Sequence, residues 1–277
     1  MIKIYRLSYK DFIERDYKSQ TRSNMSSYLC NNKIEVLANN PSITDYNRGE
    51  IVFATDDDLL VGISIFMPTR MLIDGKELIV ESGAGLEVLP EYRKSGIGVD
   101  LMSYPISQKQ FDNILYAGIS PEAYKIYKAM RFSLIDSPYF IQIRSINLIL
   151  KKFGIPNPII KCLWIIDCGI RYFYRKYIKL ISHKTRNKYH VEKLIRVPEW
   201  VDYILLMDNH KYKEIHDRKW LQWTIDNSFF EKEDNYQSFY AVYYNNNPIG
   251  YFCIGEKKKS ISGGKIKDVV FGSIYEW

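Results

Sequence analysis

The stretch Leu89–Met102 constrains the fold most, because it joins a strand end to a helix start through a basic glycine loop. Gly96 and Gly98 let the main chain approach a phosphate to hydrogen-bonding distance. Unpaired N–H groups at a helix N-terminus attract anions, and Arg93 and Lys94 add positive charge beside them. The stretch therefore predicts an α/β fold with an anion-binding loop between a strand and a helix.

A lone Gly-x-Gly also fits a plain turn, so the order of the surrounding residues decides its meaning. The loop lacks the third glycine of G-x-G-x-x-G and has no G-K-[ST], which separates it from dinucleotide and nucleoside-triphosphate loops. Its order, V-x-P followed by R-x-x-G-x-G, resembles the acyl-CoA pyrophosphate loop of the GNAT N-acetyltransferase superfamily. The resemblance implies a mixed α/β fold of GNAT type, a twisted sheet flanked by helices, with acetyl-CoA as co-substrate.

The preceding strand carries the second feature of this resemblance. Gly83 and Gly85 interrupt the run Leu78–Val88, which indicates a β-bulge or a close backbone approach. In GNAT proteins the fourth strand is bulged and splays from the fifth, and the pantetheine arm lies in the opening. On the matching positions, the resemblance implies pantetheine contacts to the main chain of Leu86, Glu87 and Val88, and cofactor contacts at Arg93, Lys94, Ser95, Gly96, Ile97 and Gly98.

A second signature follows at Pro121–Phe132. It is similar to the family's A-x-x-L-Y-x-x-x-G-F, with Ala123, Ile126 and Tyr127 in register, but Arg131 stands where the family has a helix-ending glycine. The resemblance implies that the Tyr127 phenol lies beside the cofactor sulfur and protonates the leaving thiolate. The alternative is a tyrosine that only packs its ring on the sheet.

The implied reaction is direct attack of an amine on the thioester in a ternary complex. An alkyl ammonium has a reference pKa of about 10.4, so a base or a water chain has to remove its proton. Glu81 and Glu87 on the fourth strand are the candidate bases, although each also fits a solvated strand carboxylate. A strand N–H group near Val88 would receive the developing oxyanion.

Shorter patterns predict the remaining elements. Residues 1–50 predict a strand followed by polar helices, which in GNAT proteins cover the acceptor side of the cleft. Ile51–Ala54, Val61–Phe66 and Arg70–Ile73 predict three separate strands, with the acidic residues 56–58 at a hairpin tip. The helix after the loop is expected to run from Ile97 to about residue 104, where Pro105 ends or kinks it.

The composition sets the broad class of protein. A chain of 277 residues predicts two structural units, and it contains no apolar run of 18 residues that could span a membrane. Its N-terminus lacks the apolar region of a signal peptide. Because the four cysteines form no C-x-x-C pair and the four histidines show no ligand spacing, we expect a reduced, cytoplasmic protein without a metal.

Basic charge is concentrated in one segment. Residues 151–196 hold 12 Lys or Arg against Asp167 and Glu192, interleaved with aromatic residues. Such a pattern fits nucleic acid, a membrane surface, or a pair of linker helices whose apolar stripe packs on the domains. We favour the linker, so no nucleic-acid partner is expected and peripheral membrane contact through 151–196 stays the alternative.

The pattern of the first half starts again after the basic segment. When the second half is aligned with the first, Ile249–Gly250 matches Val61–Gly62. The repeated pattern stops before a phosphate loop would begin. We therefore expect a GNAT domain at 1–145, a basic helical linker at 146–196 and a partial GNAT-like half at 197–277, either degenerate or clipped.

Three functions fit the sequence. The first is an N-acetyltransferase acting on a small-molecule amine. The second is a non-catalytic acyl-CoA-binding sensor or scaffold, and the third is transfer of a larger acyl group in cell-envelope or polysaccharide synthesis. The intact loop favours acyl-CoA as donor, and the acceptor and the oligomeric state stay open.

Overall fold

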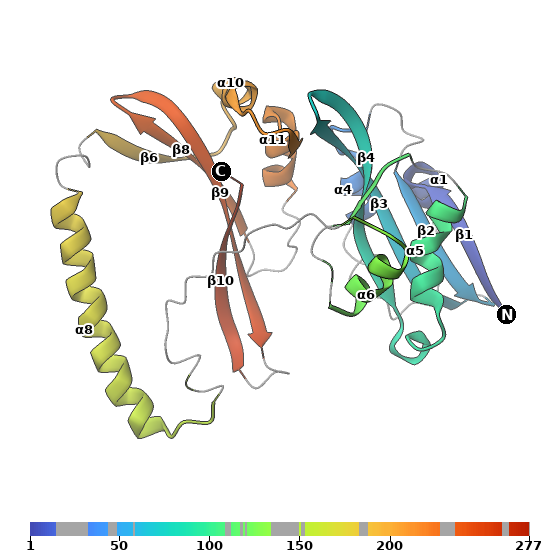
Figure 1. The fold of residues 1–277 in the computed structure, drawn as a ribbon, viewed down its shortest axis with the longest axis horizontal. Helices are drawn as coiled ribbons and strands as arrows, with labels where there is room; N and C mark the ends of the chain where they lie inside the picture. Colours follow the sequence, from blue (N-terminus) through green and yellow to red (C-terminus); the bar gives the residue numbers. More distant parts are fainter. Residues whose placement is uncertain are drawn as a thin grey trace. The chain divides into compact units, whose positions relative to one another are not determined.

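The computed structural model describes the chain except residues 15–32, 44–48, 58, 109–111, 117–118, 120, 134–149, 151–152, 183–187, 228–235, 262–265 and 277. The chain divides into two compact units (Figure 1). Unit 1 contains residues 1–134 and 205–229, and unit 2 contains residues 135–204 and 230–277. The two units differ in architecture, and each is described by itself.

Unit 1 is built on a mixed sheet of order β1-β2-β3-β4-β5, in which only the β4–β5 pair is parallel among the described pairs and β7 pairs with β3. Its strands are β1 (Ile2–Ser8), β2 (Glu50–Asp56), β3 (Leu59–Ile73), β4 (Lys76–Val88), β5 (Ile114–Tyr116) and β7 (Tyr212–Glu214). Its helices are α1 (Tyr9–Glu14), α4 (Lys33–Ala38), the 3₁₀ turn η1 (Pro90–Tyr92), α5 (Ile97–Ser107), α6 (Pro121–Ala129) and α11 (Arg218–Asp226). The predicted mixed α/β fold is confirmed.

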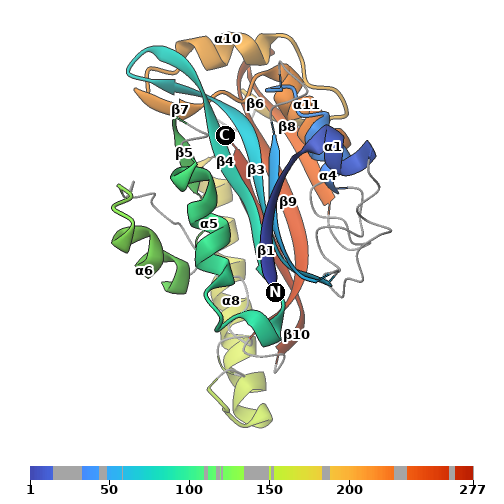
Figure 2. The same ribbon diagram turned by 90° about the vertical axis from the view of Figure 1, so that its right-hand side faces the viewer.

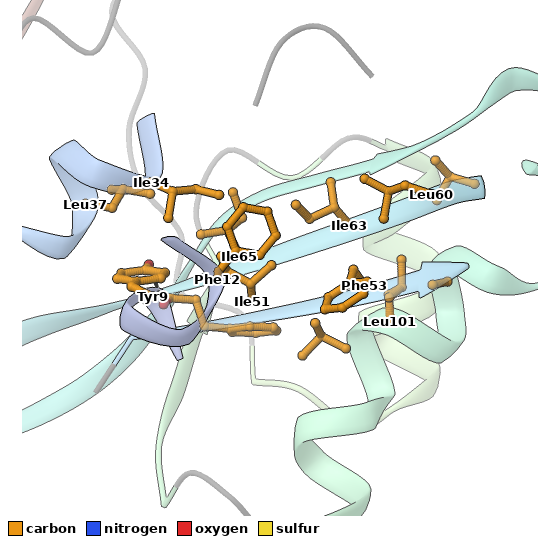
Figure 3. Close-up of a cluster of buried hydrophobic side chains, with 14 of the residues drawn as sticks. Tyr9, Phe12, Ile34, Leu37, Ile51, Phe53, Leu60, Ile63, Ile65 and Leu101 are labelled. Carbon is orange, nitrogen blue, oxygen red and sulfur yellow. Dashed lines mark hydrogen bonds between the residues drawn. The ribbon is translucent and has the colours of Figure 1, made fainter. Parts of the chain in front are cut away.

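Helices cover both faces of this sheet. Phe12 of α1 packs edge-on against Phe53 of β2, and Ile34 and Leu37 of α4 join the same buried cluster (Figure 3). Helix α5 contacts β2, β3 and β4 and lies on the opposite face, where Gly62 leaves room for it (Figure 2). A Cβ on Gly62 would come within 2.8 Å of Leu101, so the close approach of α5 requires glycine there.

Strand β3 is longer than the sequence predicts. The strands expected at Val61–Phe66 and Arg70–Ile73 are one continuous strand of 15 residues with Pro68 inside it, so their separation was wrong. Pro68 is tolerated because β2 pairs with β3 only up to Phe66 and β7 only from Met71, so its missing N–H interrupts no pairing with these two strands. The Pro68 carbonyl instead accepts a hydrogen bond from Asn40 Nδ2 at 2.8 Å.

Helix α5 also exceeds its prediction. It continues through Pro105 to Ser107, so of the two predicted effects of Pro105, an end near residue 104 was wrong. Pro105 forfeits one hydrogen bond within the helix, but its ring is buried with Leu101 and Met102. At the predicted acidic hairpin tip, the amino group of Met1 pairs with Asp56 and Asp57. Residue 58 lies outside the described residues.

A segment far along the chain completes unit 1. Residues 205–229, which the sequence places in the second half, belong to this unit. Trp223 of α11 is buried in the core cluster and donates its indole N–H to the carbonyl of Val36 at 3.2 Å. Arg70 of β3 donates to Asp217, whose other carboxylate oxygen caps α11. The compact units therefore divide the chain differently from the predicted ranges.

Unit 2 contains an antiparallel sheet of order β10-β9-β8-β6 and a long helix. Its elements are α8 (Asn157–Ile181), β6 (Tyr189–Leu194), β8 (Tyr236–Tyr244), β9 (Asn247–Ile261) and β10 (Ile266–Glu276), while α10 (Trp200–Met207) crosses the unit boundary. In its described part, the segment expected to form a pair of linker helices contains the 25-residue helix α8 and strand β6.

The strand order of unit 2 repeats that of β4-β3-β2-β1 in unit 1. The β8–β9 ladder shifts register directly after its Val242–Gly250 pair, as the β2–β3 ladder does after its Ala54–Gly62 pair. This agrees with the predicted alignment of Gly250 on Gly62, and the two-half organisation stays a prediction. No helix among the described residues is long and apolar enough to cross a membrane.

Candidate functional site

Strands β4 and β5 separate where the two glycines interrupt β4. The parallel pairing begins with Glu81 opposite Ile114 and ends with Gly83 opposite Tyr116. The β3–β4 register shifts at the same place, so that Gly83 and Gly85 lie opposite the consecutive residues Phe66 and Ile65. The predicted bulge is therefore confirmed, and in the described part of the sheet β4 pairs only with β3 beyond Gly83.

The bulge separates the two candidate bases. Glu81 and Glu87 are six residues apart and would share a face of a regular strand. Because the bulge reverses the alternation, Glu81 lies on the face of Phe66, and Glu87 shares the opposite face with Ile63. Glu81 is buried, at 6 % exposure, in the closed part of the β4–β5 ladder, while Glu87 is half-buried beyond the opening.

The main-chain groups of β4 point alternately to β3 and to the open edge of the strand. The Leu89 N–H donates to Val61, so in an antiparallel ladder Glu87 also pairs its main chain with β3. The main chains of Leu86 and Val88 therefore point to the open edge, and the Val88 carbonyl accepts a hydrogen bond from Arg93 Nε at 3.2 Å. The open edge thus offers main-chain groups of Leu86 and Val88, and the guanidinium of Arg93 is held beside them.

The loop from Arg93 to Gly98 leads directly into an uncapped helix start. Gly96 is the N-cap of α5 in the left-handed region, at φ 89°, and no side chain caps the helix. Its carbonyl accepts from residues 99 and 100, and the N–H groups of Ile97 and Gly98 have no backbone acceptor among the described residues. These donors, with exposed Lys94 and Ser95 beside them, suit a phosphate group.

Tyr127 lies in an aromatic cluster at the point where the strands separate. Its ring centroid is 4.3 Å from that of Tyr116 and 5.3 Å from that of Phe132. A Cβ on Gly83 would lie 2.4 Å from the Tyr116 ring, so glycine is needed for this packing. Burial raises the pKa of Tyr127 to about 12, so its hydroxyl keeps its proton at neutral pH.

Helix α6, which carries Tyr127, ends as the family signature predicts despite the substituted glycine. Arg131 adopts φ 63°, the Phe132 N–H donates to the Tyr127 carbonyl at 3.0 Å, and the Arg131 N–H donates to Lys128 at 3.1 Å. This is the Schellman pair of hydrogen bonds, with the accompanying contact between Phe132 and Tyr127. Arg131 therefore performs the role of glycine under strain.

A cavity of about 310 Å³ lies between α1 and α4, lined by Tyr9, Lys10, Ile13, Glu14, Glu35, Ala38, Asn39 and Ile43. It is on the side of the sheet to which Ile63 and Glu87 point. The hydroxyl of Tyr9 donates to the Phe66 carbonyl at 2.7 Å. Burial first, and then the charges of Glu81 and Glu50, raise the pKa of Tyr9 well above 10.

Sequence reasoning missed Tyr9 and Tyr116. Tyr116 could have been found from the strand glycine, because a large ring on one strand often faces glycine on its neighbour. Tyr9 gives no such signal, since its partner at Phe66 is 57 residues away. Among the described residues, no group of three or more His, Cys, Asp or Glu side chains is placed to hold a metal ion.

Comparison with known proteins gives one family match. Residues 37–135 match the family model of the acetyltransferase (GNAT) domain. No curated protein matched the sequence.

Three similar solved structures each cover about half of this chain. The aminoglycoside N-acetyltransferase AAC(6')-Iy in complex with CoA is 17% identical, covering 52% of this chain and 95% of its own, with a TM-score of 0.33. A transcriptional regulator from Bacillus halodurans C-125 is 13% identical, covering 52% of this chain and 100% of its own, with a TM-score of 0.35. A GNAT family acetyltransferase from Brucella melitensis in complex with acetyl-CoA is 19% identical, covering 51% of this chain and 92% of its own, with a TM-score of 0.30.

Proposed function

We propose that the protein transfers an acetyl group from acetyl-CoA to an amine acceptor by direct attack in a ternary complex, because residues 37–135 match the family model of the acetyltransferase (GNAT) domain. The observation that carries the proposal is that an open strand edge in β4 lies next in the chain to the uncapped start of α5. The open edge of β4 beyond Gly83 leads, within one short loop, to the uncapped N-terminus of α5. One extended donor molecule with a pyrophosphate group fits both features.

The main chain around the opening would bind the donor. Leu86 and Val88 direct backbone groups to the open edge and would pair with the pantetheine arm, whereas the Glu87 backbone is already paired with β3. The N–H groups of Gly96, Ile97 and Gly98 would bind the pyrophosphate, with Arg93, Lys94 and Ser95 beside them. The Val88 N–H would stabilise the developing oxyanion.

We assign the base to Glu87 and a structural role to Glu81. Glu87 follows the opening and shares its face of the sheet with the cavity between α1 and α4, from which a small-molecule amine would approach. Glu81 is buried on the other face of the sheet, and its charge helps to raise the pKa of Tyr9. Tyr127 would protonate the leaving thiolate, because its raised pKa keeps the phenol in its acid form.

The test combines binding and turnover on the full chain. Calorimetry with acetyl-CoA is expected to show binding, and release of free CoA thiol is expected with at least one member of a panel of small amines. Saturable acetyl-CoA binding without thiol release across the panel would favour the non-catalytic sensor. Absence of both would contradict the proposed function.

A further inference from the structure

Helix α8 exposes an apolar face that nothing in the described part of unit 2 covers. Side chains along it are between 51 % and 77 % exposed: Ile159, Ile166, Ile170, Phe173, Tyr174, Tyr177, Leu180 and Ile181. The one buried residue of the helix is Ile160, near its start. Within the described part of unit 2, the apolar stripe of α8 is therefore not packed against another element.

The eight side chains named above form a single face. With 3.6 residues per turn, they fall within an arc of about 120°. The rest of the circumference carries the charges, with the exposed Trp164, Ile165 and Tyr172 among them. These charges are Lys161, Arg171, Arg175, Lys176 and Lys179, with Asp167 as the one acid of the helix. Asp167 pairs with Arg171 at 2.5 Å, so four cations of the basic face have no acidic partner on α8.

We propose that α8 binds the surface of an anionic lipid bilayer, with its axis in the plane of the interface. The apolar arc would enter the boundary between headgroups and acyl chains, while the cations contact lipid phosphates. Phe173, Tyr174 and Tyr177 are of the type that favours this boundary. The helix is about 37 Å long and lies on the membrane rather than crossing it.

A bilayer surface satisfies both faces of the helix at once. A nucleic acid would pair with the cations but leave the apolar arc in water. A second copy of the chain docked through the apolar arc would cover that arc but bring Arg171 and Lys176, which flank it, near their own copies. An anionic interface instead offers acyl chains to one face and phosphates to the other.

Vesicle flotation of the full chain tests the proposal. Binding to vesicles of mixed phosphatidylcholine and phosphatidylglycerol is expected, with affinity that falls as salt rises, and with much weaker binding to pure phosphatidylcholine. Leu180→Ser is expected to weaken binding about tenfold. Leu206→Ser is the matched control, because Leu206 on α10 is 80 % exposed and Leu180 is 77 % exposed.

Charge can be tested in the same way. Removing two cations with Arg175→Gln and Lys179→Gln is expected to weaken binding to anionic vesicles about 25-fold, from roughly 1 kcal/mol for each basic residue. Lys76→Gln, at the exposed start of β4, is expected to have no effect. Equal losses from a test variant and its control would contradict the assignment to α8.

The cysteines of α8 offer a test of orientation. Cys162 lies in the apolar arc and Cys168 lies about 120° away on the basic face, and both are exposed. In a chain with Cys30→Ser, an environment-sensitive dye on Cys162, with Cys168→Ser, is expected to shift to the blue on vesicle addition. The same dye on Cys168, with Cys162→Ser, is expected to remain in water.

Three results would overturn the proposal. One is absence of binding to anionic vesicles by a chain with native circular dichroism. Another is an equal dye response at both cysteines. The third is a concentration-dependent dimer that Leu180→Ser dissociates while vesicles remain unbound, which would make a second copy the occupant of the apolar face.

Discussion

Glu81 and Glu87 show how one inserted residue changes the role of a side chain. Their even spacing places both on one face of a regular strand, so the sequence offered no reason to prefer either. The bulge at Gly83 and Gly85 puts them on opposite faces. Its existence was predictable from the glycines, but its effect on the carboxylates depends on the register with β3, which is a long-range property.

The first prediction separates these two carboxylates. Glu87→Gln keeps size and removes the base, so kcat is expected to fall by about 10²- to 10⁴-fold with unchanged acetyl-CoA affinity. Glu81→Gln is the matched variant on the same strand and is expected to retain kcat. Steady-state kinetics on a confirmed amine, with calorimetry for donor binding, measures both. The opposite ranking would move the base to Glu81.

The second prediction concerns the Tyr127 hydroxyl. Tyr127→Phe keeps the ring contacts with Tyr116 and Phe132 and removes only the acid, so kcat is expected to fall by about 10²- to 10⁴-fold with donor affinity unchanged. Because the pKa is about 12, the phenol is protonated at lower pH and loses its proton only as pH rises through that value. The wild-type kcat should therefore show no loss assignable to Tyr127 below about pH 10.

An unchanged kcat in the Tyr127→Phe variant would assign the tyrosine to packing. Tyr124→Phe is the control, because Tyr124 is an exposed tyrosine on the same helix, and it is expected to leave both kcat and donor affinity unchanged.

The third prediction uses the strained helix end. Arg131 has φ 63°, a conformation that costs a side chain roughly 1 kcal/mol and glycine little. Arg131→Gly is therefore expected to raise the free energy of unfolding by about 1 kcal/mol, as measured by denaturant titration. Arg131→Ala keeps the Cβ and is expected to give no such gain. An equal effect of both variants would show that the guanidinium, not the backbone, sets the difference.

At the scale of elements, the β4–loop–α5 unit was the most predictable part of the molecule. The strand, the bulge and the helix start all follow from residues close together in the sequence, and local spacing determines such features. The length of β3 did not follow, because Pro68 is tolerated only where β2 has ended and β7 has not begun. The continuation of α5 through Pro105 likewise depends on burial of the proline ring.

The fourth prediction tests the loop as an element. Gly96→Glu places a negative charge and a strained backbone at the start of α5, so acetyl-CoA affinity is expected to fall below detection in calorimetry while the fold survives. Gly75→Glu is the matched control. Gly75 also has a positive φ, of 79°, and a Cβ added at either glycine would meet no atom within 4 Å. It lies at a hairpin turn, and its variant is expected to bind acetyl-CoA normally.

The acetyl-CoA affinities of Gly96→Glu and Gly75→Glu are compared. Unchanged affinity in a folded Gly96→Glu protein would show that the pyrophosphate is not bound at the start of α5. Loss of affinity in both variants would trace the effect to general strain or charge.

At the scale of the whole molecule, the composition of unit 1 was the least predictable feature. The sequence suggested a boundary near residue 145, and the first-half elements do form one sheet. Trp223 nevertheless lies 187 residues along the chain from its hydrogen-bond partner Val36. The sequence pattern around Trp223 predicts an amphipathic helix but carries no information on which core that helix covers.

The fifth prediction tests this long-range contact. Trp223→Ala removes a large buried side chain from unit 1, so its free energy of unfolding is expected to fall by about 3 to 5 kcal/mol. Trp164→Ala removes the same side chain from an exposed position on α8 and is expected to change stability by less than about 0.5 kcal/mol. Thermal unfolding monitored with and without acetyl-CoA reports on unit 1. Equal stability of the two variants would contradict the place of Trp223 in this core.

The return of residues 205–229 to unit 1 has a consequence during synthesis. Most strands of the unit 1 sheet are translated early, but α11 is the last part of its core to be translated, and 95 residues separate Leu134 from Phe229. At 5 to 20 residues per second, roughly 5 to 20 s pass between these points on the ribosome. During that time the apolar surface that Trp223 covers in the complete unit is open, and exposed apolar surface makes a growing chain prone to aggregation.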